Sequence, residues 1–299
     1  MIHPLPARTD SGLDPGQLAA LAAVVEFGSF DGAAERLHVT PSAISQRIKA
    51  LEQRIGQVLV LRERPCVPTP AGVPLVRLAA QTALLQAETL AEITGGSAER
   101  VRIALAVNAD SVSTWFTGVF ARLPDVLFDV HIEDQDHSAR LLREGVVMGA
   151  VTTERTAIAG CRVQPLGVMR YLPVATPDYL ARHFPDGFTR EAAAAAPSLA
   201  WNRTDALQDQ LMRKVFRKDV QRPVHYIPTA EGFGAAVRAG LGWGMYPEQL
   251  LADGAFVPIT TQHLDVPLYW QCWKLDSTTV GRITEAVRAA ASGLRGRRQ

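Results

Sequence analysis

Cysteine is scarce in this 299-residue sequence. Its three cysteines, Cys66, Cys161 and Cys272, lie far apart and are odd in number. This argues against a disulfide framework and is typical of a protein in a reducing compartment. No apolar run is long enough to cross a bilayer, and the first residues lack the apolar core of a signal peptide. The sequence therefore predicts a cytoplasmic protein with no membrane partner.

Motifs that bind cofactors or carry nucleophiles are also missing. The glycine-rich stretch from Gly240 to Gly244 lacks the spacing of a dinucleotide-binding turn, and no P-loop pattern occurs. Neither a G-x-S-x-G elbow nor a C-x-x-C pair is present. Seven histidines are scattered along the chain, as structural histidines often are. We therefore expect that the protein is not an enzyme and that it has no catalytic residue, no metal-binding residue and no cofactor.

Net charge is small, at +1, but its distribution is uneven. Between Arg36 and Arg64 six cations stand against two acidic residues. The cations are Arg36, Arg47, Lys49, Arg54, Arg62 and Arg64. A basic stripe within a nearly neutral chain is typical of a nucleic-acid-binding end joined to a part with another task.

Phe30 to Leu51 reads as two short helices joined by a tight turn. Thr40 is a favourable N-cap, and Pro41 stands at the first helical position, where proline is tolerated best. Apolar residues then recur at helical spacing: Ile44, Ile48, Leu51 and Ile55. A second face carries hydroxyls, an amide and a cation: Ser42, Ser45, Gln46 and Lys49. Such groups suit base edges and phosphates, so this stretch is predicted to bind double-stranded DNA.

A short β-prone run, Val58 to Leu61, is followed by arginines and by Cys66-Val67, and is predicted to form a two-stranded wing. Arg62 and Arg64 would lie at its tip, over the DNA backbone or minor groove. We expect Ser45, Gln46 and Lys49 to contact base edges. The remaining predicted DNA-binding residues, assigned to helix capping or phosphate contact, are Arg36, Thr40, Ser42, Arg62 and Arg64.

Strands and helices alternate through the C-terminal two-thirds, which predicts parallel sheets with helical crossovers. The expected strands include 101–107, 126–132, 146–151, 171–175 and 267–273. The expected helices include 112–123, 138–144, 177–184, 206–216 and 279–291. We therefore predict two α/β lobes, with ligand-binding loops at the strand ends.

The N-terminal motifs form one ordered pattern. It runs through GSFDGAAERLHVTPSAISQRIKALEQRIG, the wing arginines and Pro68 to Gly72. In order and spacing it resembles the LysR-type transcriptional regulators. Further blocks resemble the LysG/ArgP-like subgroup, which regulates export of basic amino acids. They are LRERPCVPTPAG (61–72), AVNADSVSTWF (106–116), EDQDH (133–137), CRVQPLGVMRY (161–171), NRTDALQ (202–208) and WGMYP (243–247).

The resemblance implies an α/β protein with a winged helix-turn-helix, a linker helix and a two-lobed effector domain like a periplasmic binding protein. The expected ranges are 13–69 for DNA binding, 70–95 for the linker and 99–292 for the effector domain, with lobe I at 99–170 and 268–292 and lobe II at 171–267. It also implies a homodimer assembling to a homotetramer, an operator DNA, contact with RNA polymerase, control of an amino-acid exporter gene and L-lysine or L-arginine as effector.

A basic amino acid needs partners for a carboxylate, an ammonium and a cationic side chain. Backbone N–H groups at a strand-to-helix turn favour a carboxylate, which points to Asn108, Ser111 and Thr114, and to Thr229 from the second lobe. Carboxylates on loops beside strand ends suit the side-chain cation, and the candidates are Asp110, Asp134, Asp136 and Asp205. We expect Asp205→Ala to weaken binding.

Other functions fit parts of this pattern. The nearest alternative is a LysR-type regulator that responds to a different small molecule. A chromosome-architecture protein that binds bent, AT-rich DNA would need only the N-terminal module, and competition with unrelated DNA would separate it from an operator-specific regulator. A solute-binding transport protein would share the second fold but not the first module.

Overall fold

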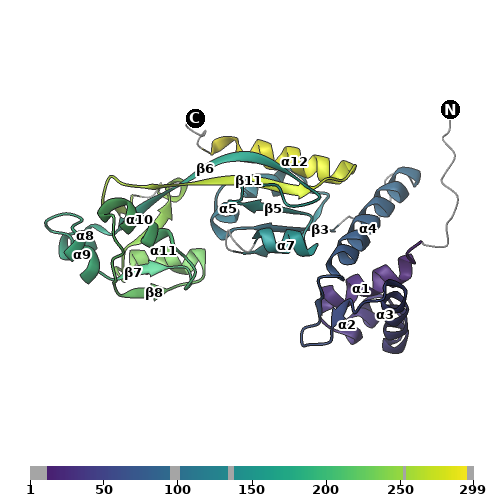
Figure 1. Ribbon diagram of the computed structural model, residues 1–299. Helices are drawn as coiled ribbons and strands as arrows, with labels where there is room; N and C mark the ends of the chain where they lie inside the picture. The colour runs from purple at the N-terminus through teal and green to yellow at the C-terminus, as the bar shows by residue number, and fades with distance from the viewer. Residues whose placement is uncertain (1–11, 95–101, 134–137, 252–253, 295–299) are drawn as a thin grey trace.

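The computed structural model describes residues 12–94, 102–133, 138–251 and 254–294. Its N-terminal module packs three helices, α1 (Pro15–Phe27), α2 (Phe30–Arg36) and α3 (Pro41–Ile55), around one small core (Figure 1). Thr40 caps α3 through the Ala43 N–H, and Gly56 ends that helix in the left-handed conformation. The predicted helix-turn-helix is therefore confirmed.

A two-stranded wing follows α3. Its strands β1 (Val60–Leu61) and β2 (Val67–Pro68) pair antiparallel, as predicted. Glu52 of α3 accepts a hydrogen bond from the Leu59 N–H at 2.9 Å, which ties the wing to the recognition helix. A Cβ on Gly72 would stand only 2.0 Å from the Leu59 carbonyl oxygen, so only glycine fits where the wing meets the next helix.

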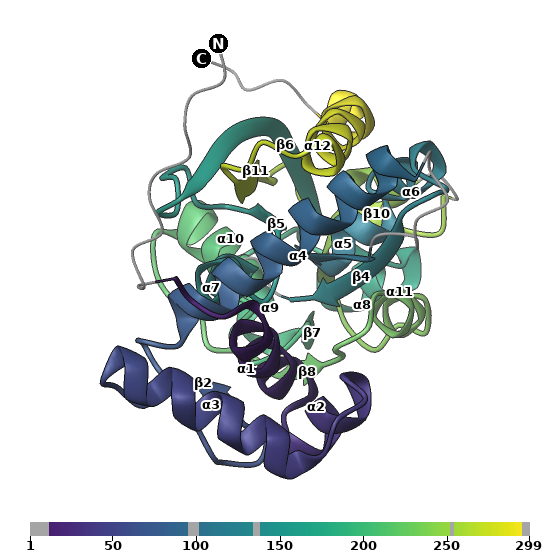
Figure 2. The same cartoon turned by 90° about the vertical axis from the view of Figure 1, so that its right-hand side faces the viewer.

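The long helix α4 (Val73–Ile93) joins the two parts of the chain and lies along the C-terminal part (Figure 2). At its N-terminal half Arg77 donates to the Ala159 carbonyl, and at its C-terminal half Glu88 accepts from the Ser277 hydroxyl and the Thr279 N–H, at 2.7 and 2.8 Å. Leu84 is buried between these points in the main core. The helix is thus docked on its own effector domain by polar contacts at both ends.

Lobe I is built on three parallel strands. They are β3 (Arg102–Val107), β4 (Leu127–Ile132) and β5 (Gly149–Thr152), with β3 in the middle. The helices of this lobe are α5 (Ala109–Ser113), α6 (Thr117–Arg122), α7 (Ser138–Glu144) and α12 (Thr278–Ala290), and a 3₁₀ turn (Ala291–Gly293) follows α12.

Two long strands carry the sheet out of lobe I into lobe II (Figure 1). β6 (Cys161–Ala175) and β11 (Leu264–Trp273) pair antiparallel from Cys161 and Trp273 to Tyr171 and Leu264. Their register shifts between Leu268 and Tyr269, a bulge of the kind that bends a strand pair. Arg170 and Asp265 face each other across the pair in a bidentate ion pair at 2.7 and 2.9 Å.

Lobe II adds short strands at the far end of β6. β9 (Gly244–Pro247) and β10 (Val257–Pro258) pair with β6, while β7 (Ser198–Ala200) and β8 (Val224–Tyr226) form a separate parallel pair. The helices of lobe II are α8 (Pro177–His183), α9 (Arg190–Ala195), α10 (Leu207–Phe216), α11 (Ala230–Arg238) and a 3₁₀ turn (Glu248–Leu250).

Three expectations about these elements are wrong in detail. The strand expected at 171–175 begins ten residues earlier, at Cys161. Pro165 and Gly167, residue types that are rare in strands, interrupt the apolar pattern of this first part. The helix expected at 112–123 is broken into α5 and α6, which are separated by Thr114, Trp115 and Phe116. The short elements α9, β9 and β10 were not expected, since each is too short to show a period in the sequence.

The docking of α4 can be tested through Glu88. Burial alone would raise the pKa of this carboxyl, but hydrogen bonds from Thr279 and Ser277 lower it below its ordinary value. The contact is therefore complete at neutral pH and is lost as pH falls through that lowered pKa. Glu88→Ala removes the carboxylate from the start of α12 and should cost roughly 1 kcal/mol, as the loss of a helix cap does.

We expect faster hydrogen–deuterium exchange in α4 and the first turn of α12 in Glu88→Ala than in the wild type. Glu92→Ala is the matched control, because this glutamate lies one turn on and is exposed. Equal exchange in the two variants would mean that Glu88 does not hold the helix.

Candidate functional site

The recognition helix α3 shows two separate faces. Ile44, Ile48 and Leu51 are fully buried in the N-terminal core. On the remaining surface Ser42, Gln46 and Lys49 are exposed and Ser45 is partly buried. Thr40 is exposed at the start of the helix, where its hydroxyl lies 2.9 Å from the Ser42 hydroxyl. The polar residues predicted to contact DNA thus share a solvent-facing surface.

The predicted phosphate-binding arginines lie around this surface. Arg62 and Arg64 are exposed in the loop between β1 and β2, and Arg36 is exposed in the last turn of α2. The Arg62 guanidinium lies 4.9 Å from the centre of the Phe30 ring, which orients it beside α2. Their roles on DNA remain predictions.

A cleft of about 1190 Å³ separates the two lobes. Lobe I contributes the end of β3 and the start of α5, lobe II contributes the loop from Trp201 to Leu207, and Asp265 to Pro267 of β11 lie at the base. Small-molecule sites usually measure about 300 to 1,000 Å³, so this cleft has room to close further on a ligand.

Asp110 is a carboxylate that lobe I places in the cleft. Its Oδ2 accepts a hydrogen bond at 2.7 Å from the hydroxyl of Tyr171 in β6, whose side chain is fully buried. Burial raises the pKa of Asp110 to about 6; the Tyr171 hydrogen bond opposes this rise, and the negative charge of Asp205 adds to it. Among the described residues, no cation is paired with this carboxylate.

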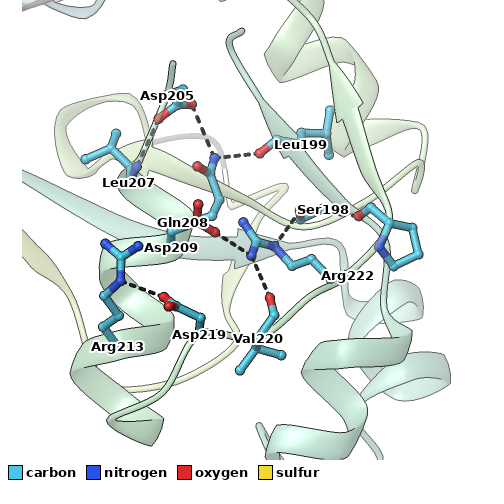
Figure 3. A network of polar contacts seen from close by, with 11 residues as sticks. Ser198, Leu199, Asp205, Leu207, Gln208, Asp209, Arg213, Asp219, Val220 and Arg222 are labelled. Carbon is cyan, nitrogen blue, oxygen red and sulfur yellow. Dashed lines mark hydrogen bonds and ion pairs between the residues drawn. The ribbon is translucent and has the colours of Figure 1, made fainter. Parts of the chain in front are cut away.

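Asp205 is the carboxylate of lobe II, and it organises its own loop (Figure 3). Its two oxygens accept hydrogen bonds from the Trp201 N–H at 2.9 Å and the Leu207 N–H at 3.1 Å, and the Gln208 amide lies 3.5 Å away. Gln208 also donates to the Leu199 carbonyl. Asp205 therefore holds the loop between β7 and α10 in shape as well as placing a negative charge in the cleft.

The buried side chain of Arg222 connects elements of lobe II next to the Asp205 loop (Figure 3). The Arg222 side chain is 6% exposed and donates to Asp209 at 2.7 Å and to the Ser198 hydroxyl at 2.9 Å. Its guanidinium also lies 5.8 Å from the centre of the Trp243 ring. These contacts tie α10 to β7, so the loop that carries Asp205 stands on a rigid base.

The other predicted effector residues are placed differently. Asn108 lines the cleft, is 4% exposed, and its side-chain oxygen has no hydrogen-bond partner among the described residues. Ser111 accepts the Trp115 indole N–H and Thr114 donates to the Asp110 carbonyl. Thr229 caps α11. Ser111, Thr114 and Thr229 do not line the cleft, and Asp134 and Asp136 lie outside the described residues.

Four residues of the site were not predicted from the sequence. Glu133 and Arg140 of lobe I and Arg203 of lobe II line the cleft, and Tyr171 reaches Asp110. A signal existed for Tyr171, since a tyrosine inside a buried strand needs a partner for its hydroxyl. The arginines carried no signal, because exposed cations on helices and loops are common.

Charges in the cleft are unequal. Asp110, Glu133 and Asp205 stand against Arg140 and Arg203, while Asp265 is already paired with Arg170. The excess of carboxylate favours a ligand that carries more positive than negative charge. The described residues hold no cluster of side chains fit for a metal ion, and none of their helices is long and apolar enough to span a membrane.

A winged helix-turn-helix joined to a two-lobed binding domain defines a ligand-responsive DNA-binding regulator. The family model "Bacterial regulatory helix-turn-helix protein, lysR family" matches residues 15–73, and "LysR substrate binding domain" matches residues 94–287. The chain belongs to the LysR family of bacterial transcriptional regulators.

Its relatives include LysG/ArgP regulators, as the sequence motifs predicted. The chain is 69% identical to the HTH-type transcriptional regulator LysG of Mycobacterium tuberculosis, over 95% of this chain and 96% of that protein. The crystal structure of ArgP from M. tuberculosis gives a TM-score of 0.88 at 69% identity and covers 96% of this chain and 100% of that one. Full-length LysG from Corynebacterium glutamicum with bound effector Arg is 42% identical with a TM-score of 0.77, covering 94% and 99%.

The two groups of DNA-binding residues predict different mutant behaviour. Gln46→Ala removes an amide from the exposed face of α3 and should relax the preference among operator variants by about 1 to 3 kcal/mol at one base position. Arg64→Ala should weaken binding to every sequence alike and reduce the salt slope by about one.

Titrations of operator variants at several salt concentrations measure both effects. Gln57→Ala is the control, because this exposed glutamine lies beyond the end of α3. An unchanged sequence preference in Gln46→Ala would refute the assignment of that residue to base reading.

Proposed function

We propose that this regulator senses L-lysine or L-arginine in the cleft between its lobes and controls the gene of an amino-acid exporter. The observation that carries this proposal is the excess of carboxylate in the cleft, with Asp110 on one lobe and Asp205 on the other. One relative supports it twice: LysG of C. glutamicum, 43% identical, is called a lysine export transcriptional regulatory protein, and its full-length structure holds Arg as effector.

The cleft offers a partner for each charged group of such a ligand. A carboxylate pairs with the cation of the side chain, and the unpartnered oxygen of Asn108 suits the α-ammonium. Arg140 and Arg203 are available for the α-carboxylate. Trp201 and Phe233 provide apolar surface for the aliphatic stem. A neutral amino acid would leave one carboxylate of the cleft without a partner.

We infer that two subunits pair through α4. On this helix Leu78 and Leu85, one heptad apart, are exposed, and so are Leu90 and Ile93. Exposed leucines at this spacing favour burial against a second helix. Pairing would place two copies of α3 on DNA about one helical turn apart, roughly 34 Å, or a multiple of it. Two such dimers would form a tetramer. The tetramer would contact adjacent operator sites, bend the DNA between them and present this bent promoter to RNA polymerase.

Calorimetry with the full chain tests the effector. L-Arginine and L-lysine should bind, whereas L-citrulline, which has nearly the shape of arginine but no side-chain charge, should bind at least about tenfold more weakly. Asp110→Ala and Asp205→Ala should each weaken L-arginine by about 10- to 100-fold, since hydrogen bonds to charged groups contribute roughly 1.5 to 3 kcal/mol.

Asp178→Ala is the control for these variants, because Asp178 is an exposed residue at the start of α8, away from the cleft. Equal affinity for citrulline and arginine would remove the basic-amino-acid assignment but leave the regulator intact.

Footprinting on the intergenic DNA upstream of the protein's own gene tests the regulatory half of the proposal. We expect protection of paired half-sites without effector and a changed protected length or bend with L-lysine, because an effector that prefers one cleft geometry shifts the assembly toward it. Identical footprints with and without L-lysine and L-arginine would refute control by these amino acids.

A further inference from the structure

The hydrogen bond between Tyr171 and Asp110 joins two functional parts of the effector domain. Asp110 stands on α5 of lobe I, and Tyr171 lies in β6 where this strand pairs with both Pro247 of β9 and Leu264 of β11. The strand that connects the lobes therefore places the Tyr171 hydroxyl against the Asp110 carboxylate. Among the described residues this hydroxyl is the only hydrogen-bond donor to that carboxylate.

Charged residues of both signs lie around Asp110, but among the described residues no cation forms an ion pair with it. Lobe I contributes Glu133 and Arg140 to the same cleft, lobe II contributes Arg203 and Asp205, and β11 contributes Asp265. Helix α11, which contacts α5, carries Glu231 and Arg238, and the Arg238 guanidinium lies over the Phe256 ring. None of these cations forms a salt bridge with Asp110 within the part of the chain that the structure describes.

Asp110 and Asp205 differ in how many of their hydrogen-bonding positions remain open to a ligand. Asp205 already accepts hydrogen bonds from two backbone N–H groups of its own loop, so both of its oxygens have partners within the protein. Asp110 has one donor, Tyr171, and a partly buried position. An effector cation therefore changes the environment of Asp110 far more than that of Asp205.

We propose that the effector cation takes the place of a proton on Asp110, so that a basic amino acid binds with release of that proton to the solvent. In this step the carboxyl O–H bond breaks, and the guanidinium or ammonium of the effector donates to the freed carboxylate. Tyr171 acts as a positioning residue that holds the carboxylate and favours its ionised form. The inference rests on the proposed effector class and adds that its binding depends on pH.

The direction of the dependence follows from the pKa of about 6 for Asp110. Above this value the carboxylate is ready for the cation, and below it a proton must first leave. The guanidinium of L-arginine stays charged throughout this range. Affinity for L-arginine should therefore be nearly constant above about pH 7 and should fall by about tenfold between about pH 7 and about pH 5.

Calorimetry of the full chain with L-arginine at about pH 6, in two buffers of different ionisation enthalpy, counts the protons released. We expect about half a proton per site for the wild type, since half of the Asp110 carboxyls are protonated there. Tyr171→Phe should release more than the wild type and shift the fall in affinity to higher pH, because a donor to the ionised form is lost. Asp110→Asn, titrated at high L-arginine concentration, should bind weakly and without pH dependence.

Tyr269→Phe is the matched control, because it removes a buried tyrosine hydroxyl from β11, the partner strand, without touching Asp110. It should behave like the wild type. Intact L-arginine binding with no proton released, or a Tyr171→Phe profile equal to that of Tyr269→Phe, would overturn the proton linkage and leave the proposed effector standing. Absence of L-arginine binding at every pH would instead overturn both.

Discussion

The pairing of β6 with β11 is the interaction on which the effector domain depends. These strands share one register from Cys161 and Trp273 to Tyr171 and Leu264, interrupted by a single bulge. β5 extends the sheet on one side of that bulge, and β9 and β10 extend it on the other. One hydrogen-bonded sheet therefore runs from lobe I into lobe II, and the Arg170–Asp265 ion pair lies across the bent strand pair that joins them.

The two ends of the chain carry opposite electrostatic character. Exposed cations surround α3 and the wing, whereas carboxylates predominate in the cleft. The net charge of +1 hides this separation, because it sums the charges of the whole chain. The separation suits a protein that must attract a polyanion at one end and a cationic small molecule at the other without either ligand competing for the wrong site.

Local signals explain what the sequence could predict. A cap, a first-turn proline and a terminal glycine lie within α3 itself, so its limits and its polar face followed from Thr40, Pro41 and Gly56. The cleft depends instead on distant contacts. Tyr171 and Asp110 are 61 residues apart, and no local sequence pattern at either residue predicts their contact. Ser111 and Thr114 were expected to bind the effector because they lie at a strand-to-helix turn, but a short helix points its successive side chains in different directions.

The docking of α4 on lobe I sets which part of the molecule can move relative to DNA. α4 packs against α1 at one end and is held by Ser277 and Thr279 of lobe I at the other. Helix α4 thus joins the DNA-binding module to lobe I, and lobe II lies beyond this connected part. If an effector narrows the cleft, lobe I keeps its position relative to the DNA-binding module and lobe II moves. Under the proposed function, a subunit contact on lobe II would therefore respond to the effector, whereas a contact on lobe I would not.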